Sequence, residues 1–261
     1  MNPMAAKSYG EIFDGDWDKL RAGTQLAISY KEKWPELIPL FEQISAQNAV
    51  FIMIWNMIIN RIIYTVDKRK VCGYDASMYL AENGVDFIMS NHHLETFKCT
   101  AIMQQRAIRY FEEFTGDPTK VIVNLEGVYK RYTGDYFHFL QQTVCIEMDS
   151  NKHPFVFLNY IYDITYLKKY KTGNLIITTP GELKWWNFNF DKNCLEPVQP
   201  LSKQEKKILS LLAEGKSSKE IAEELFISPH TVDTHRRHLL EKTNCIDTTG
   251  MITYARLVGL L

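Results

Sequence analysis

The stretch SPHTVDTHRRHLL, residues 228–240, decides how the C-terminal part of this chain folds. Ser228 can cap a helix whose first turn holds Pro229, because a proline there loses only an N–H that has no partner within the helix. The residues expected to face inward recur at helical spacing and are Val232, His235 and Leu239. The opposite face carries hydrogen-bonding and charged side chains, namely His230, Asp233, Thr234, Arg237 and Glu241.

Three further short helices are expected around this one. Ser202 and Ser217 are each followed three residues later by a glutamate, the pattern of a capping box, and then by apolar residues at helical spacing. Gly215 stands where the first of these helices should end, and Asp247 can cap a last helix. The sequence therefore predicts four short amphipathic helices in residues 201–261.

This region resembles the LuxR-type helix-turn-helix domain of bacterial transcription regulators. The matching positions run through the whole stretch and are Leu201, Glu205, Leu209, Leu212, Ala213, Gly215, Ser217, Lys219 to Ala222, Leu225, Ile227, Ser228, Thr231, Val232, His235 and Lys242. The resemblance implies that the helix from Pro229 is a recognition helix lying in the major groove of DNA. The helix from Ser217 to Leu225 would brace it, with the whole motif at about residues 217–236.

The resemblance also implies which side chains meet DNA. Asp233, Thr234 and Arg237 match base-facing or nearby positions, and Arg237 is the strongest candidate because arginine can form two hydrogen bonds with guanine. Hydroxyl, amide or ammonium groups would meet phosphate at three other positions. The complete expected set is Ser217, Lys219, Thr231, Asp233, Thr234, Arg236 and Arg237.

Two residues depart from the usual family pattern. The family commonly has lysine at the position of Asp233 and a small or aliphatic residue at that of Arg236. Phosphates repel an aspartate, which can instead accept from a cytosine amino group or orient an arginine. Alternatively, Asp233 pairs on the helix surface with Arg236 or Arg237, at i+3 and i+4. The sequence leaves these alternatives open.

The charge of the C-terminal region indicates how it would bind DNA. Residues 201–261 hold nine basic and eight acidic residues, a net charge of plus one. A nearly neutral domain should bind phosphate weakly, so two copies on one DNA site are expected. In the family the last helix often pairs protomers, and here the apolar residues that could do so, or could pack inside the helical bundle, are Tyr254, Leu257, Val258, Leu260 and Leu261.

The part before residue 191 has a mixed pattern. Two β-rich runs, AVFIMIW and RIIYTV, are followed by short helices and by a longer helix with Leu94, Phe97, Ala101, Ile108 and Phe111 on or near one face. Three strand candidates come next, VIVNLEGVYKRYT, YFHFLQQTVCIEM and FVFLNYIYDIT, separated by turns. The segment NLIITTPGELKWWNFNF then predicts a β-hairpin whose adjacent tryptophans, Trp185 and Trp186, face opposite sides.

This order of elements resembles a PAS domain over about residues 48–166. The segments that carry the resemblance are VCGYDASMYL with Gly73 to Asp75, MSNHHLE from Met89 to Glu95, TGDYFHFLQQ, and the closing Asp163 to Thr165. The expected fold is α+β, with a PAS-like five-stranded antiparallel sheet and flanking helices followed by an all-α four-helix LuxR-type domain. The expected boundaries are 1–47 for a helical extension, 48–190 for the PAS-like domain with its hairpin, 191–200 for a linker and 201–261 for the DNA-binding domain.

Composition excludes several classes of protein. The chain has 261 residues, of which 46% are hydrophobic and 23% charged, with a net charge of minus one, which fits a soluble globular protein. The five cysteines are dispersed, so neither a disulfide framework nor a zinc site is expected and a cytoplasmic location fits. The longest apolar run is too short to span a membrane. His92 and His93 are more consistent with the start of a helix than with haem ligation.

These observations predict a DNA-binding transcription regulator. Its expected partners are double-stranded DNA, a second copy of the chain, and a small-molecule or protein signal at the PAS-like domain; no cofactor, metal or membrane partner is expected. The sequence offers no nucleophile with a base, phosphate loop or paired metal motif, so no enzymatic activity is expected. The alternative is a protein-interaction adaptor whose helical tail no longer binds DNA.

Overall fold

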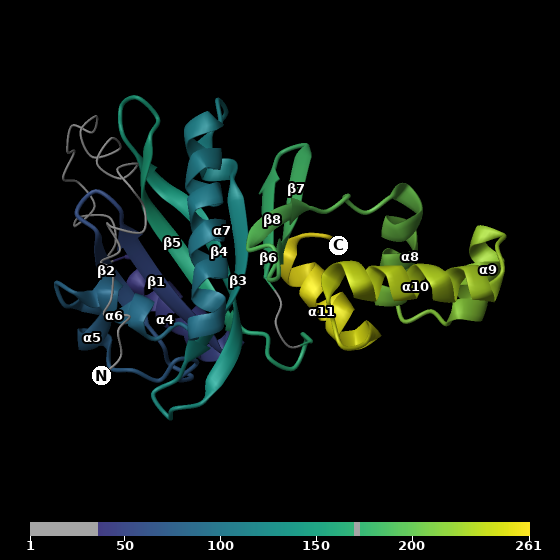
Figure 1. The fold of residues 1–261 in the computed structure, drawn as a ribbon, viewed down its shortest axis with the longest axis horizontal. Coiled ribbons are helices and arrows are strands. Elements are labelled where there is room, and N and C mark those ends of the chain that lie inside the picture. Colours follow the sequence, from purple (N-terminus) through teal and green to yellow (C-terminus); the bar gives the residue numbers. More distant parts are fainter. Residues whose placement is uncertain (1–35, 170–172) are drawn as a thin grey trace.

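The structure is a computed structural model that describes residues 36–169 and 173–261. Figure 1 shows a sheet with its helices, followed by the C-terminal helices on one side. The elements before residue 198 are α4 (Ile38–Asn48), β1 (Val50–Asn56), β2 (Arg61–Val66), α5 (Ala76–Leu80), α6 (Gly84–Ser90), α7 (Leu94–Glu113), η1 (Pro118–Lys120), β3 (Ile122–Lys130), β4 (Tyr136–Met148), β5 (Pro154–Asp163), β6 (Asn174–Thr179), β7 (Glu182–Asn189) and β8 (Cys194–Pro197).

The sheet is antiparallel and larger than the five strands that the sequence predicts. Its order is β2-β1-β5-β4-β3-β6-β7-β8, because β6 pairs with β3 over Ile122–Leu125 and brings the hairpin into the sheet. Residues 191–200, expected as a linker, contain β8, which pairs with β7. Leu195 of β8 packs against the main core, and this apolar contact explains why the segment joins the sheet.

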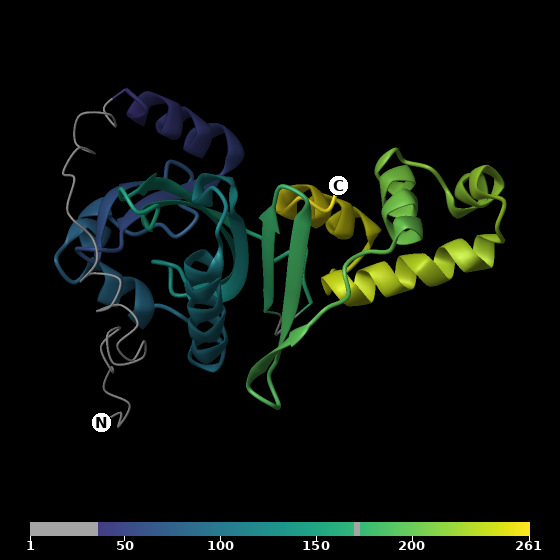
Figure 2. The same ribbon diagram turned by 90° about the horizontal axis from the view of Figure 1, so that it is seen from above.

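The two faces of the sheet are covered by different elements. Side chains alternate along each strand, so neighbouring residues serve opposite faces. One face packs against α5, α6 and α7 in the main core. The other face packs against α4 over β1 and β5, and against the C-terminal helices over β4, β6 and β7. Figure 2 shows α4 and α7 on opposite sides of the sheet, with α11 beside β6 and β7.

The long helix α7 buries part of the predicted face, since Ala101 and Phe111 are buried. Leu94, expected on the inner face, is 73% exposed. The buried side of the helix also contains Thr96, Cys99, Met103, Ala107 and Tyr110. The small Thr96 and Cys99 let the helix approach the sheet, and this orientation turns the first residue of the helix to the surface.

The N-terminal extension expected over 1–47 is described only from residue 36. Pro39 lies in the first turn of α4, where a proline costs no hydrogen bond. Phe41 and Ser45 of α4 are buried, and Ser45 accepts a hydrogen bond from the backbone N–H of Lys68 at 3.0 Å. The rest of the expected extension lies outside the described residues.

The C-terminal region forms the four helices that the sequence predicts. They are α8 (Lys203–Ala213), α9 (Ser218–Leu225), α10 (Pro229–Thr243) and α11 (Thr248–Val258). Both expected capping boxes are present at α8 and α9. Gly215 adopts φ +87° after α8, a conformation that favours glycine. In the described part of the chain, every helix is too short or too polar to cross a bilayer.

Candidate nucleic-acid interface

Helices α9 and α10 form a compact helix-turn-helix. Phe226 ends α9 with φ 53°, and the backbone N–H of Ile227 donates to the carbonyl of Ala222 at 3.0 Å, so the chain reverses tightly. Ser228 caps α10 by accepting from the N–H of Thr231 at 3.0 Å. Val232 is fully buried against the other helices, which fixes the angle of α10.

The polar face of α10 is open to solvent. The side chains of Asp233 and Arg237 are 60% and 68% exposed, and His230 is also exposed. Arg237 lies 3.9 Å from Glu241, so its guanidinium group is only loosely held. Figure 1 shows α10 extending away from the sheet toward α9, with this end of the helix clear of the sheet.

The predicted phosphate-contacting residues lie around the start of both helices. Ser217 caps α9 in a reciprocal pair with Glu220, and Lys219 is exposed in the first turn of α9. The hydroxyl of Thr231 lies 2.8 Å from that of Ser228 at the start of α10. These hydroxyl and ammonium groups are therefore near the N-terminal ends of helices, where anions are favoured.

Thr234 and His235 lie between the exposed face and the core of the helical domain. The hydroxyl of Thr234 donates to the carbonyl of His230 at 3.0 Å, so it is satisfied within the helix. His235, expected to face inward, is only half-buried, whereas Leu239 is fully buried. The inward stripe of α10 is therefore narrower than its spacing predicts.

Arg236 differs from its neighbour Arg237 because it bonds within the domain. Its guanidinium group donates to the hydroxyls of Ser218, at 2.9 Å, and Thr248, at 3.0 Å. The guanidinium group of Arg236 also lies 3.6 Å from the Asp233 carboxylate. Of the two surface pairings that the sequence offered for Asp233, the structure therefore has the one with the arginine at i+3. Sequence spacing could not reveal Ser218 and Thr248, because they reach α10 from α9 and α11.

The C-terminal end of α10 is tied to α8 by a charged pair. The ammonium group of Lys242 lies 2.8 Å from the Glu205 carboxylate, which also belongs to the capping box of α8. Burial alone would raise the pKa of Glu205, but hydrogen bonds from Lys242 and Ser202 lower it below its usual value. This contact orients α10 relative to the rest of the domain.

The face of the sheet that packs against α7 has a partly open cavity of about 100 Å³. Most of its lining is apolar, and none of the lining side chains is Asp, Glu, Lys or Arg. Three polar residues on β4 and β5 bond to one another: Thr143 donates to Asn159 at 2.7 Å, and Gln141 donates to Asn159 at 3.0 Å. The interrupted apolar pattern of these strands is the sequence signal that could have marked the cavity.

His92 adds a further polar atom to this cavity. Its Nδ1 is buried and has no hydrogen-bond partner among the described residues. Burial lowers the pKa of His92 to about 4, so its ring is neutral at physiological pH. His93 behaves differently, since its Nδ1 caps α7 by accepting from the N–H of Glu95. The two adjacent histidines therefore have separate roles.

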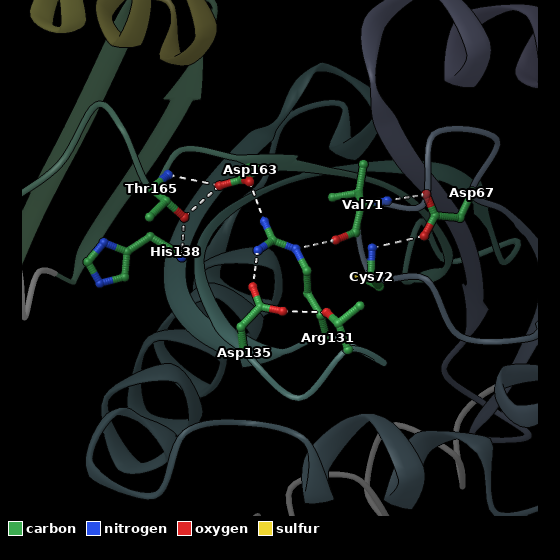
Figure 3. Close-up of polar contacts among 9 residues, drawn as sticks. Asp67, Val71, Cys72, Arg131, Asp135, His138, Asp163 and Thr165 are labelled. Atoms are coloured by element: carbon green, nitrogen blue, oxygen red, sulfur yellow. Dashed lines mark hydrogen bonds and ion pairs between the residues drawn. The ribbon is translucent and has the colours of Figure 1, made fainter.

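Arg131 connects the segment before α5 to the end of β5, as Figure 3 shows. Its guanidinium group bonds to the carbonyl of Val71, at 3.0 Å, and to the carboxylates of Asp135 and Asp163. Asp163 in turn accepts from both the N–H and the hydroxyl of Thr165. The segment that leaves β5 is thus anchored before it reaches the C-terminal helices.

That segment carries a buried lysine between the sheet and the helical domain. The ammonium group of Lys168 lies 2.7 Å from the Glu126 carboxylate, and both side chains are almost completely buried. Lys168 also donates to the carbonyl of Thr243, at the end of α10, at 2.5 Å. The Glu126 carboxylate accepts from Asn174 at 2.9 Å, and Asn174 accepts from the indole of Trp185 at 2.9 Å. These five residues form the interdomain network.

Apolar and backbone contacts surround the interdomain network. Tyr254 and Val258 of α11 are buried in the same cluster as Ile176 and Trp185 of the sheet. The ammonium group of Lys168 lies 3.3 Å from the centre of the Tyr254 ring. Backbone pairs join residues 167–169 to 244–246. Trp185 therefore faces the helical domain, while Trp186 packs toward α7, so the two tryptophans face opposite sides as predicted.

The geometry of α9 and α10 defines a helix-turn-helix domain, and comparison with known proteins gives its family. Residues 199–255 match the family described as "Bacterial regulatory proteins, luxR family". The C-terminal domain is therefore a LuxR-type helix-turn-helix domain, as the sequence predicts.

Two of the curated relatives match over about 60 residues. Over 60 residues the chain is 43% identical to "Oxygen regulatory protein NreC" of Staphylococcus carnosus, covering 23% of this chain and 28% of that protein. Over 59 residues it is 49% identical to "Transcriptional regulatory protein LiaR" of Bacillus subtilis, again covering 23% and 28%. The chain thus spans little more than a quarter of the length of these relatives.

A solved structure described as "VqmA bound to DPO" aligns with most of the chain. The alignment covers 87% of this chain and 88% of the other at 18% identity, with a TM-score of 0.32.

Proposed function

We propose that this protein is a cytoplasmic, non-enzymatic transcription regulator in which a PAS-like sheet domain controls a LuxR-type DNA reader. The observation that carries the proposal is the solvent-exposed polar face of α10, with Arg237 and Asp233, in a domain that matches the LuxR family. A helix so presented fits the major groove, and an arginine on it can bond guanine.

The order of elements supports a PAS-like sheet domain. Two strands, two short helices, one long helix and three antiparallel strands follow one another, as the sequence resemblance implies. The closing Asp163 to Thr165 forms a defined turn bonded to Arg131. The additional strands β6 to β8 extend this arrangement and bring it against the helical domain.

The cavity favours a small, neutral signal molecule with at least one hydrogen-bonding group. Its lining contains no charged side chain, so an ionic ligand would lose its hydration without gaining a partner. The unpartnered His92 Nδ1 and the polar group around Asn159 offer directional contacts. A cavity of about 100 Å³ is of the order that holds a single small ring.

The sheet can transmit such a signal because the cavity and the helical domain lie on opposite faces of the same strands. Gln141 lines the cavity, while the adjacent Gln142 donates to the carbonyl of Leu257 in α11 at 3.2 Å. Leu125 lines the cavity, while the adjacent Glu126 holds Lys168. A ligand that binds one strand arrangement more tightly would therefore favour one position of the helical domain.

We also propose that the regulator acts as a homodimer held mainly by the sheet domain. Of the five apolar residues at the C-terminus that the sequence offered for dimerisation, Tyr254, Val258 and Leu260 are buried within the chain. Leu37, which precedes α4, and Leu40 of α4 are more exposed than most apolar side chains. These exposed leucines on the outer surface favour contact through α4.

DNA binding at two salt concentrations tests the proposed function. Full-length protein should bind genomic duplex fragments with an affinity that falls as salt rises, and Lys219→Ala should reduce the logarithmic slope by about one. Lys192→Ala is the matched control, because it removes the same charge from the turn before β8. Binding without salt dependence, or no binding, would favour the protein-interaction adaptor.

A further inference from the structure

The two carboxylate oxygens of Asp233 have different surroundings. Oδ1 accepts from the hydroxyl of Ser218 at 2.7 Å and lies 3.6 Å from the guanidinium group of Arg236. Oδ2 has no hydrogen-bond or ion-pair partner in residues 36–169 and 173–261. One oxygen therefore anchors the side chain and the other is available on the exposed face of α10.

Arg236 stabilises this arrangement because it links α10, on which it lies, to α9 and α11. It is bonded to Ser218 at the start of α9 and to Thr248 at the start of α11, and its side chain is only 34% exposed. Its positive charge stays beside Asp233 and offsets part of the carboxylate charge. Phosphate repulsion of Asp233 is thereby reduced, while Arg237 remains free to face outward.

The bases differ in what they offer to a carboxylate in the major groove. Guanine presents only acceptors there, and adenine presents its amino group beside the acceptor N7. Cytosine presents an amino donor without an adjacent ring acceptor. A carboxylate oxygen accepts only, so cytosine is the base that it matches.

We propose that Asp233 reads a cytosine amino group through Oδ2, with Ser218 and Arg236 as positioning residues that fix the carboxylate. This inference rests on the proposed function, in which α10 enters the major groove. It assigns Arg236 to the support of a base-reading side chain rather than to a base or phosphate contact of its own.

Selection of bound sequences from random duplexes tests the inference. Wild-type full-length protein should require a cytosine at one position, and Asp233→Asn should change that preference to adenine, because asparagine pairs with adenine N6 and N7. The expected change in preference is on the order of tenfold. Glu223→Gln is the matched control, since it removes one negative charge from the exposed surface of the neighbouring α9 and should leave the preferred base unchanged.

Ser218→Ala tests the positioning role. Loss of the anchor should reduce the cytosine preference at that position relative to all other positions, whereas a purely structural defect would weaken every sequence equally. The inference is overturned if Asp233→Asn and wild type select the same base, or if Glu223→Gln shifts the preferred base too. Failure of wild type to select any sequence would instead overturn the proposed function itself.

Discussion

The two faces of the central sheet differ in how they bury polar groups. On the α7 side, β4 and β5 meet a cavity of about 100 Å³ with neutral polar groups and an unpartnered His92 nitrogen. On the other side, the same sheet holds a buried ion pair, Glu126 with Lys168, whose polar groups bond across to α10. The first face can adapt to an occupant, and the second fixes the helical domain to the sheet.

The largest effect on the free energy of unfolding should come from removing one member of the buried ion pair. Lys168→Met leaves Glu126 buried without its cation, which should lower the free energy of unfolding by about 3–5 kcal/mol in a urea titration. The double variant Glu126→Gln with Lys168→Met should recover much of that loss. Lys169→Met is the control, because Lys169 is exposed beside it. Equal effects of the two lysine variants would show that the pair does not hold the domains together.

The second largest difference is expected when a buried alanine is enlarged on each face of the sheet. Ala255→Leu, in the packed cluster that joins α11 to the sheet, should cost about 1–3 kcal/mol by overpacking. Ala107→Leu, which points to the cavity, should change the free energy of unfolding by less than about 1 kcal/mol. Thermal unfolding measures both. Similar losses at the two sites would contradict a cavity on the α7 side.

At neutral pH the smallest effect is expected on the cavity face, where His92 makes stability depend on pH only under acidic conditions. The pKa of His92 is lowered to about 4 in the folded protein, against about 6.5 when unfolded. Between these values the unfolded chain binds a proton that the folded chain does not, so stability falls as the pH drops from about 6.5 toward 4. In a series of urea titrations, His92→Phe should show a weaker decline than wild type. An unchanged decline would mean that His92 is not buried as described.

The helical domain was predicted more fully than the sheet domain for a physical reason. Each of its helices carries a local start signal, such as the capping boxes at Ser202 and Ser217, and these signals act within a few residues. The sheet domain depends on pairing between distant strands, so its eight-stranded order and β8 could not be deduced from local patterns.

In the candidate site, too, contacts between distant residues could not be predicted from the sequence. Sequence spacing offered Arg236 or Arg237 as partners of Asp233, and only the structure shows that Arg236 is held by Ser218 and Thr248. Lys168 and Thr243 are 75 residues apart, so nothing local marks their contact. The residues that join the two domains are therefore those that the sequence could least reveal.

The proposal that α10 enters the major groove and reads a base through Arg237 is tested most sharply by the sequences that Arg237→Ala selects. Full-length wild type and the variant would each select sequences from random duplexes at one fixed salt concentration. We expect wild type to require a guanine at one position and the variant to accept any base there, with a loss of about 1–3 kcal/mol in discrimination and the other positions unchanged. An identical selected sequence for both proteins would show that Arg237 does not read a base.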